Sequence, residues 1–176
     1  MLFKFDRLYY GEGLNFLAGI DDSKKLTPKK RDFLFEEIKK KALAFSIAIV
    51  DNKIIDEINI LQATFKAMGD AFASLKIKPD LCLIDGNHKV PQLHWRQNCP
   101  QEAVIGGDAK SASIAAASIL AKVARDKIMD DYAKIYHQYG FEKHKGYGTK
   151  AHIEAIQKFG ACPIHRMTFA PLNSKP

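Results

Sequence analysis

The sequence has few cysteines, no long apolar run, and no repeat, linker or low-complexity tract. Its three cysteines, Cys82, Cys99 and Cys162, form no C-x-x-C pair, which argues against both a disulfide framework and a zinc site. No apolar run approaches the ~20 residues that a membrane-spanning helix needs. Residues 1–13 mix charged with apolar side chains, unlike a secretory signal. These absences favour a protein of the reducing cytoplasm without a membrane partner.

Size and composition indicate a folded globular protein with a basic surface. Its 176 residues, 47% of them apolar, fit one domain over residues 1–176 with an irregular tail at 161–176. The net charge of +7 favours a polyanionic partner. Two stretches carry much of the positive charge, although each alone also fits a solvated helix face. Their basic residues are Lys24, Lys25, Lys29, Lys30 and Arg31, then Lys143, Lys145, Lys150, Lys158 and Arg166.

Helices and strands alternate in the expected secondary structure. Thr27-Pro28 is typical of an N-cap and first helical residue, and predicts a helix to about Lys41. Apolar residues spaced by three and four predict an amphipathic helix that ends before Pro79. This apolar stripe consists of Ile54, Ile58, Leu61, Phe65, Met68, Phe72 and Leu75. Further helices are expected from about Ser111 to Tyr136 and from the cap Thr149 to Gly160.

Three short apolar runs predict strands, at residues 43–50, 81–84 and 102–109. The run at 81–84 does not alternate with polar residues, as expected for a strand that is covered on both faces. The long helix after the third run begins with alanines and serines, which let a helix lie close to a sheet. Strands that alternate with helices predict an α/β layer structure.

Asp85 is the first candidate for chemistry, because it ends the apolar run Leu81–Ile84 on a charge. Ligands of α/β sheets gather at the carboxyl ends of strands, where this residue is expected. Gly86 allows a tight turn there, and the Asn87 amide can reach a phosphate or hydroxyl. The alternative is that Asp85 only caps the following turn, as Asp often does.

Asp126 is the second candidate, because it lies on the apolar stripe of the long helix, three residues after Val123. A buried carboxylate is costly unless it is paired or binds a metal, and Lys122 is the local alternative partner. If Asp85 and Asp126 converge, their repulsion requires a proton or a cation. Oxygen ligands suit Mg²⁺ or Mn²⁺, and such a site on a basic protein fits phosphodiester hydrolysis.

Other features are weaker signals. Residues 106–111 place glycines, Lys110 and Ser111 at a helix start that could attract phosphate. Tyr147, between two glycines, is exposed enough to stack on a sugar or base, although exposed loop tyrosines are common. The six histidines show no metal-ligand spacing, and Asp130 and Asp131 fit a solvated face.

Several long motifs, in order from about Gly19 to Pro171, closely resemble bacterial ribonuclease HII. They are DDSKKLTPKKR (21–31), IDEINILQATFKAM (55–68), LIDGN (83–87), GDAKSASIAAASILAKVARD (107–126), YGFEKHKGYGTKAHIEAI (139–156) and CPIHR (162–166). The resemblance implies an RNase H-like mixed sheet flanked by helices. It also implies metal-dependent endonucleolytic cleavage of RNA in RNA–DNA hybrids, including single ribonucleotides embedded in DNA, with Mg²⁺ or Mn²⁺. We expect a monomer.

The resemblance assigns roles to individual residues. Asp85 and Asp126 match two of the family's four catalytic, metal-binding carboxylates. Tyr147 matches the tyrosine that helps to read the RNA–DNA junction. The remaining matches sit in motifs that line the substrate path, and they are Lys24, Asn87, Lys110 and Ser111.

One departure from the family concerns an N-terminal strand with an Asp-Glu pair, followed by Gly-Arg-Gly. The acids complete the metal site, and Gly-Arg-Gly senses the ribose 2′-OH. This chain lacks the segment, so the fold is expected to lack its first strand and part of its second. Asp56-Glu57 is interpreted as a decoy, and Asp6 and Glu12 have no motif around them. The chain is therefore read as a truncated enzyme that is weak or inactive, with a non-catalytic hybrid-binding remnant or an unstable fragment as alternatives.

Overall fold

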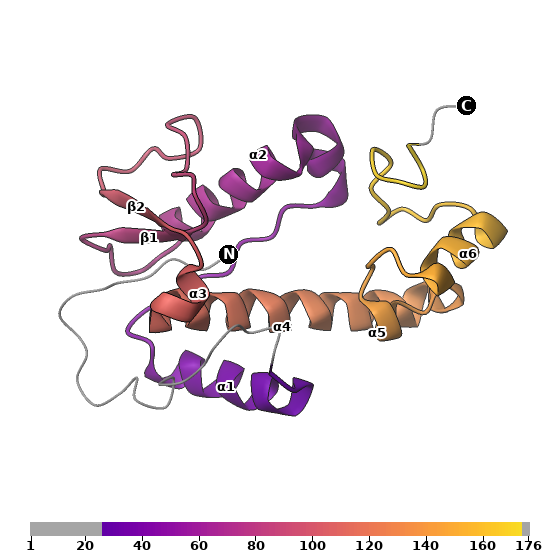
Figure 1. Cartoon of the computed structure of the whole chain (residues 1–176), viewed down its shortest axis with the longest axis horizontal. Helices are drawn as coiled ribbons and strands as arrows, with labels where there is room; N and C mark the ends of the chain where they lie inside the picture. Colours follow the sequence, from indigo (N-terminus) through magenta and orange to yellow (C-terminus); the bar gives the residue numbers. More distant parts are fainter. Residues whose placement is uncertain (1–25, 174–176) are drawn as a thin grey trace. The chain divides into compact units, whose positions relative to one another are not determined.

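The computed structural model describes residues 26–173, which divide into two compact units. Unit 1 contains residues 26–49 and 64–123 of this range, and unit 2 contains residues 50–63 and 124–173. The regular elements (Figure 1) are α1 (Pro28–Lys41), α2 (Asn52–Ala73), β1 (Cys82–Asp85), β2 (Gln101–Val104), α3 (Gly107–Lys110), α4 (Ala112–Ile135), η2 (His137–Tyr139), α5 (Phe141–His144) and α6 (Lys150–Phe159). Helices α2 and α4 each contribute residues to both units.

Helix α1 begins and ends where its sequence predicts. The Thr27 hydroxyl accepts a hydrogen bond from the Lys30 N–H at 3.3 Å, and Pro28 follows as the first helical residue. The helix ends at Lys41 on three lysines, whose charge suits the negative end of the helix dipole. Its buried residues Leu34, Phe35 and Ile38 pack in unit 1 against the first half of α4.

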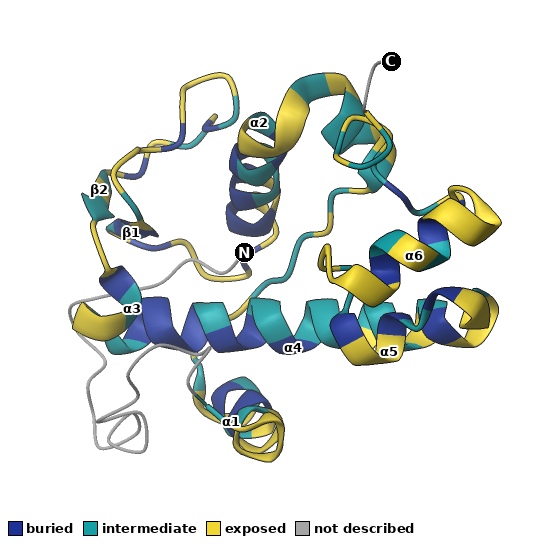
Figure 2. Cartoon of the chain, turned by 45° about the vertical axis from the view of Figure 1, so that its right-hand side comes forward, coloured by how far each residue is buried: buried dark blue, intermediate teal, exposed yellow. Residues whose placement is uncertain are grey.

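The first half of α4 supplies the other side of this core. Its small residues Ala115, Ala116 and Ala117 are buried with Ile119 and Leu120, so the helix lies close to its neighbours. Figure 2 shows this stretch of α4 as mostly dark blue, and the inner face of α1 likewise. The small side chains therefore allow close packing, but the neighbour in this core is helix α1, whereas the sequence led us to expect a sheet.

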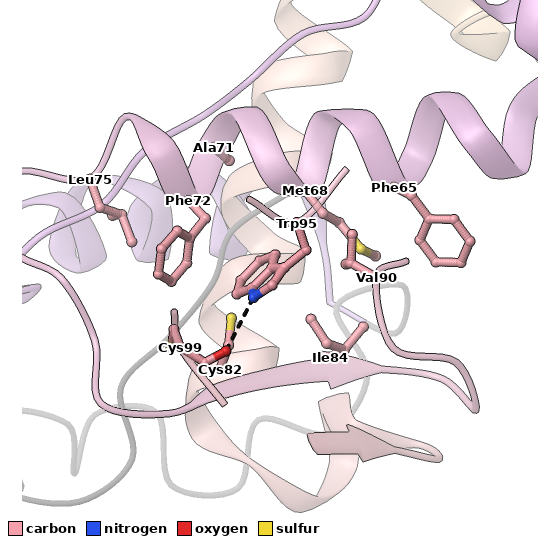
Figure 3. Packing of buried hydrophobic residues seen from close by; sticks show 10 residues of the cluster. All are labelled: Phe65, Met68, Ala71, Phe72, Leu75, Cys82, Ile84, Val90, Trp95 and Cys99. Carbon is pink, nitrogen blue, oxygen red and sulfur yellow. Dashed lines mark hydrogen bonds between the residues drawn. The ribbon is translucent and has the colours of Figure 1, made fainter. Parts of the chain in front are cut away.

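A two-stranded parallel sheet forms the second core of unit 1. Cys82 pairs with Gln101 and Asp85 with Val104. Cys82 and Ile84 are buried beneath α2 among Phe72, Trp95 and other apolar side chains (Figure 3). The Trp95 indole N–H donates to the Cys99 carbonyl at 3.1 Å, so its polar group is satisfied inside the core. The predicted buried strand at 81–84 is thereby confirmed.

The predicted strand at 43–50 is wrong, because residues 42–51 form no regular element. The segment has the composition of a strand, but a strand also needs hydrogen bonds to a neighbouring strand. Within residues 26–173, β1 and β2 are paired with each other and not with this segment. Ala44 and Ala48 pack against the sheet core, whereas Leu43, Phe45 and Ile49 are exposed. The third predicted strand is shorter than expected, because the chain turns at Gly106 into α3.

Helix α2 is interrupted, which the continuous apolar stripe did not predict. Asn59 has φ 66° and ψ 166°, and its side-chain oxygen accepts from the N–H groups of Leu61 and Gln62 at 3.0 and 3.1 Å. Asn59 therefore caps a second helical segment inside α2. Beyond it the stripe is buried as predicted from Phe65 onward, whereas Leu61 is exposed.

Unit 2 has its own core around Phe141, with Tyr139, Ile156 and Cys162. Thr149 caps α6 by accepting from the His152 N–H at 3.3 Å, and Gly160 follows its end, as predicted. Residues 161–173 contain no helix or strand. The molecule thus has the predicted α/β character, with helices and a parallel strand pair. None of its described helices combines the length and apolarity needed to cross a membrane.

Candidate functional site

Asp85 lies exposed at the carboxyl end of β1, where the sequence predicts it. Its Oδ1 accepts a hydrogen bond from the Gly107 N–H at 2.9 Å. The alternative interpretation, that Asp85 only caps the following turn, does not describe this bond, because its donor lies 22 positions later in the chain. This single bond fixes the carboxylate and leaves its second oxygen directed to no hydrogen-bond partner among residues 26–173.

Gly107 brings the start of α3 against Asp85. A Cβ atom at this position would lie 2.5 Å from Ile114 Cδ1 and 3.2 Å from Asp85 Oδ1. Only glycine permits this approach without a shift of its neighbours. Because Asp85 already binds the Gly107 N–H, that group is not available to the phosphate expected at residues 106–111.

The predicted substrate-contacting residues of unit 1 differ in their surroundings. Asn87 is exposed just after Gly86, which has φ 110°. The Lys110 ammonium donates to the Ile105 carbonyl at 2.7 Å, and Ser111 stands at the N-terminus of α4. Lys24 lies outside the described residues.

Asp126 is half-buried in the second half of α4, in unit 2, which agrees with the predicted inward-facing position. Asp85 belongs to unit 1, so each unit presents one of the two predicted carboxylates. Among residues 26–173, no group of three or more His, Cys, Asp or Glu side chains is arranged to hold a metal ion.

Arg125 is a functional candidate that the sequence did not single out. Its guanidinium carbon lies 4.9 Å from the centre of the Tyr147 ring, a cation–π contact. Its buried Nη1 has no hydrogen-bond partner within the described chain. Adjacent residues on a helix point in different directions, so the candidate Asp126 does not draw attention to Arg125. The contact between Arg125 and Tyr147 becomes visible only in the folded structure.

Tyr147 is exposed by 56%, as the flanking glycines predict. Its backbone is nevertheless fixed, because its N–H donates to the His144 carbonyl at 2.9 Å. The preceding turn uses positive φ at Lys145 (51°) and Gly146 (74°). Lys145 forms a salt bridge to Asp130 on α4, so Asp130, whose side chain is still 46% exposed, is also a structural partner of this loop.

Asp56, which the sequence analysis interprets as a decoy for the catalytic acids, has a structural role. Its carboxylate accepts from the Met167 N–H at 2.8 Å, and from the N–H and hydroxyl of Thr168 at 3.0 and 2.6 Å. The Asn52 amide donates to the carbonyls of Pro163 and His165. Together they fasten the tail (161–173) to the first part of α2.

Arg166 is a second cation of unit 2 that is influenced by the charge of Arg125. Burial lowers the pKa of Arg166, the nearby Arg125 charge lowers it further, and Asp56 opposes both effects. The guanidinium also lies 3.8 Å from the centre of the Phe169 ring. Of these two cations, Arg125 lies beside the exposed Tyr147 ring, and a guanidinium next to an exposed aromatic ring suits contacts with phosphate and bases.

The chain matches the family model described as Ribonuclease HII over residues 14–172. It is 54% identical to a Ribonuclease HII of Endomicrobium trichonymphae, over 98% of this chain and 93% of that protein. A Ribonuclease HII of Caldicellulosiruptor bescii is 58% identical over 87% of this chain and 72% of its own length. The ribonuclease H2 of Pyrococcus horikoshii OT3 has a similar structure, with a TM-score of 0.75 and 27% identity over 92% of this chain and 82% of that chain.

The alignment lengths show that this chain lacks residues that two of its relatives have. The Endomicrobium alignment spans 200 positions and one with Caldanaerobacter subterraneus spans 193, and both exceed the 176 residues of this chain. Each therefore contains positions inside the aligned region at which the relative has a residue and this chain has none. The Caldicellulosiruptor bescii alignment spans 153 positions, which equals the 87% of this chain that it covers, so it includes no such net gap.

Proposed function

The chain belongs to the ribonuclease HII family of RNase H-type endonucleases, and from this premise we propose that it acts on RNA–DNA hybrids. The substrate class includes single ribonucleotides embedded in duplex DNA. The reaction is water attack on the phosphodiester 5′ of the ribonucleotide. We further propose that the chain works in the cytoplasm as a single-domain monomer.

The observation that carries this proposal is the position of Asp85. Its carboxylate stands exposed at the end of a buried strand, oriented by the Gly107 N–H, with one oxygen left over for an external ligand. Exposed carboxylate oxygens are the donors that Mg²⁺ and Mn²⁺ prefer. A bound divalent ion would activate water and stabilise the leaving oxygen. We propose Asp85 and Asp126 as metal ligands, with the catalytic role that this implies.

The substrate contacts are proposed on both units. On unit 2, the exposed Tyr147 ring offers a stacking surface, and the unpaired Nη1 of Arg125 offers a donor to an anion. The residues proposed on the rest of the chain are Lys24, Asn87, Lys110 and Ser111. The net charge of +7 supports a polyanionic ligand.

The Asp-Glu pair and Gly-Arg-Gly of the family are absent from this sequence. The positions at which two long alignments find no residue in this chain support a loss inside the aligned region. With two of four acids present, cleavage should be weak or absent. A hybrid-binding protein that no longer cleaves is the second candidate function, and the intact Tyr147 and Arg125 arrangement favours it.

The test uses a duplex with one embedded ribonucleotide, incubated with the chain and Mg²⁺ or Mn²⁺. We expect binding that weakens as salt rises, and any cleavage to fall to background in Asp85→Asn. Asparagine keeps an oxygen for the Gly107 N–H, so this variant removes the charge while retaining the local fold. Glu102→Gln, which changes an exposed carboxylate on β2, is the matched control and should behave like the parent.

Three outcomes separate the possibilities. Strong cleavage that persists in Asp85→Asn would refute the site. Strong cleavage that Asp85→Asn abolishes would show that another acid replaces the missing pair. Absence of binding to the hybrid at low salt would reject both the enzyme and the binding protein.

A further inference from the structure

Three histidines of unit 2 are buried beside the loop that carries Tyr147. They are His144 of α5, His152 of α6 and His165 of the tail. The His144 and His152 rings stack with centroids 4.4 Å apart, and those of His152 and His165 are 5.3 Å apart. Buried polar groups need hydrogen-bond partners, so the partners of each ring nitrogen show which parts of unit 2 the histidines connect.

The hydrogen bonds of His152 and His165 form one continuous chain. The Cys162 N–H donates to His165 Nδ1 at 2.8 Å. The Nε2 atoms of His165 and His152 are 3.1 Å apart. His152 Nδ1 is 3.0 Å from the Tyr147 carbonyl oxygen. The two rings thus link the tail to the backbone of Tyr147.

The two ends of this chain fix where its protons lie. A backbone N–H can only donate, so His165 Nδ1 is unprotonated and its Nε2 carries the proton. A carbonyl oxygen can only accept, so His152 Nδ1 carries the proton and its Nε2 accepts from His165. Every ring nitrogen is used once, and both imidazoles are neutral. Protonation of either ring would place two N–H groups against each other.

The same loop is held at further points. His144 Nδ1 accepts from the Gly146 N–H at 3.2 Å, and its Nε2 bonds the Tyr139 carbonyl at 2.8 Å. The Tyr147 carbonyl also accepts from the Thr149 N–H at 2.8 Å. The backbone of Tyr147 is therefore fixed on both sides. Its side chain contacts Arg125 and remains exposed to solvent.

We propose that His152 and His165 are positioning residues, whose ring-to-ring hydrogen bond sets the orientation in which the Tyr147 ring meets a ribonucleotide-containing duplex. This inference rests on the proposed function of Tyr147. Asp56 and Asn52 belong to the same arrangement, because they fix the tail from which His165 extends. The tail therefore contributes to the geometry of the substrate loop through His165 and its bond to His152.

The test compares substitutions at His152. Phenylalanine keeps the ring shape and removes both hydrogen bonds, whereas asparagine retains an N–H close to the position of Nδ1. We expect His152→Phe to reduce the preference for a ribonucleotide-containing duplex over the same all-DNA duplex by about tenfold, within the range for loss of one stacked base. His152→Asn should recover part of this preference. His137→Gln, an exposed histidine of unit 2, is the control and should leave it unchanged.

A double-mutant cycle with Tyr147→Ala decides whether the histidine acts through the tyrosine. If it does, His152→Phe adds no further loss once Tyr147 is removed. Full additivity of the two losses, or an unchanged preference in His152→Phe, would overturn the proposal. If the parent chain shows no preference at all, the proposed function fails, and the positioning role is judged by the next measurement.

Nuclear magnetic resonance gives a readout that needs no substrate. Nitrogen-15 shifts should report the proton on Nδ1 of His152 and on Nε2 of His165. In His152→Phe, the Thr149 amide, whose N–H bonds the Tyr147 carbonyl, should exchange with solvent at least tenfold faster. The opposite tautomers, or unchanged exchange at Thr149, would refute the positioning role independently of binding.

The stability of the chain should also depend on pH through this pair. Burial lowers the pKa of His152 and His165, and a neighbouring histidine lowers each further. The ionisable groups packed around them are the His144 imidazole, the Tyr139 phenol and the Cys162 thiol, none of which is negative at neutral or lower pH. In the unfolded chain both rings gain protons below about pH 6.5.

As pH falls through that value, the unfolded state binds protons that the folded state does not, so stability declines toward the lowered folded pKa. Above about pH 7.5 both states are neutral, and these groups add no pH dependence. We expect the urea midpoint to be lower at pH 5.5 than at pH 7.5. The drop should be smaller in a His152→Phe, His165→Phe double variant. An equal drop in parent and variant would assign the effect to other groups.

Discussion

Replacing Phe141 with alanine is expected to lower the free energy of unfolding by about 4 kcal/mol, in the range for buried Phe→Ala changes. The Phe141 side chain is 1% exposed at the centre of the unit 2 core. It stacks on the Tyr139 ring at 5.4 Å and meets the rings of His144, His152 and His165 edge-on or tilted. Aromatic neighbours around a fixed turn cannot close the cavity, so little of the loss is recovered by relaxation.

Urea denaturation followed by circular dichroism measures this effect, provided that the slope of the transition is unchanged. Phe159→Ala is the matched control, because this ring lies half-exposed at the end of α6 and contacts Tyr139 only at 6.2 Å. It should cost less than about 1 kcal/mol. Similar losses for the two variants would mean that Phe141 is not the centre of this core.

Gly69→Ala is expected to destabilise unit 1 by about 3 kcal/mol, because a core that is already full cannot accept the added methyl group. A Cβ atom on Gly69 would lie 2.0 Å from the His94 carbonyl oxygen and 3.1 Å from its carbon. The obstacle is backbone, which cannot swing aside like the end of a side chain. Either α2 or the turn at residues 91–95 must move, and that turn holds Trp95 in the core.

The control for this substitution is Gly148→Ala, where a Cβ atom meets nothing within 4 Å. Its expected effect on the urea midpoint is within experimental error or slightly stabilising, since alanine reduces the freedom of the unfolded chain. If the fluorescence of Trp95 in Gly69→Ala changes at lower urea than the circular dichroism signal does, the damage lies in the turn. A midpoint equal to that of the parent would contradict the close packing of α2 on His94.

The elements that the sequence predicts well are those with local causes. Thr27 and Thr149 cap their helices through bonds to residues three positions away, so the neighbouring sequence contains the whole interaction. The strand at 81–84 is apolar enough to be buried whatever lies beside it. In contrast, residues 43–50 have the composition of a strand, but no partner strand lies among residues 26–173, and pairing is a property of two segments.

In the candidate site too, features with local causes could be predicted and features with long-range causes could not. The place of Asp85 at a strand end and the exposure of Tyr147 follow from a few adjacent residues. The bond from Gly107 to Asp85, the Arg125 contact with Tyr147 and the Asp56 clamp on the tail each join residues 22 to 112 positions apart. None of these leaves a local signal. The spacing of the histidines excludes a recognisable metal motif, but it gives no indication that two of the rings share a hydrogen bond.

The segment at 43–50 also bears on how the protein behaves in concentrated solution. It combines β-branched and aromatic residues, and its Leu43 and Ile49 side chains are 55% and 69% exposed. Such a stretch is a template for intermolecular β-pairing, which proteins ordinarily suppress by covering or charging it. Charged residues flank it on both sides, namely the lysines at the end of α1 and Asp51. We therefore expect Ile49→Lys to reduce self-association of this chain at high protein concentration, because it places a charge on this exposed apolar segment.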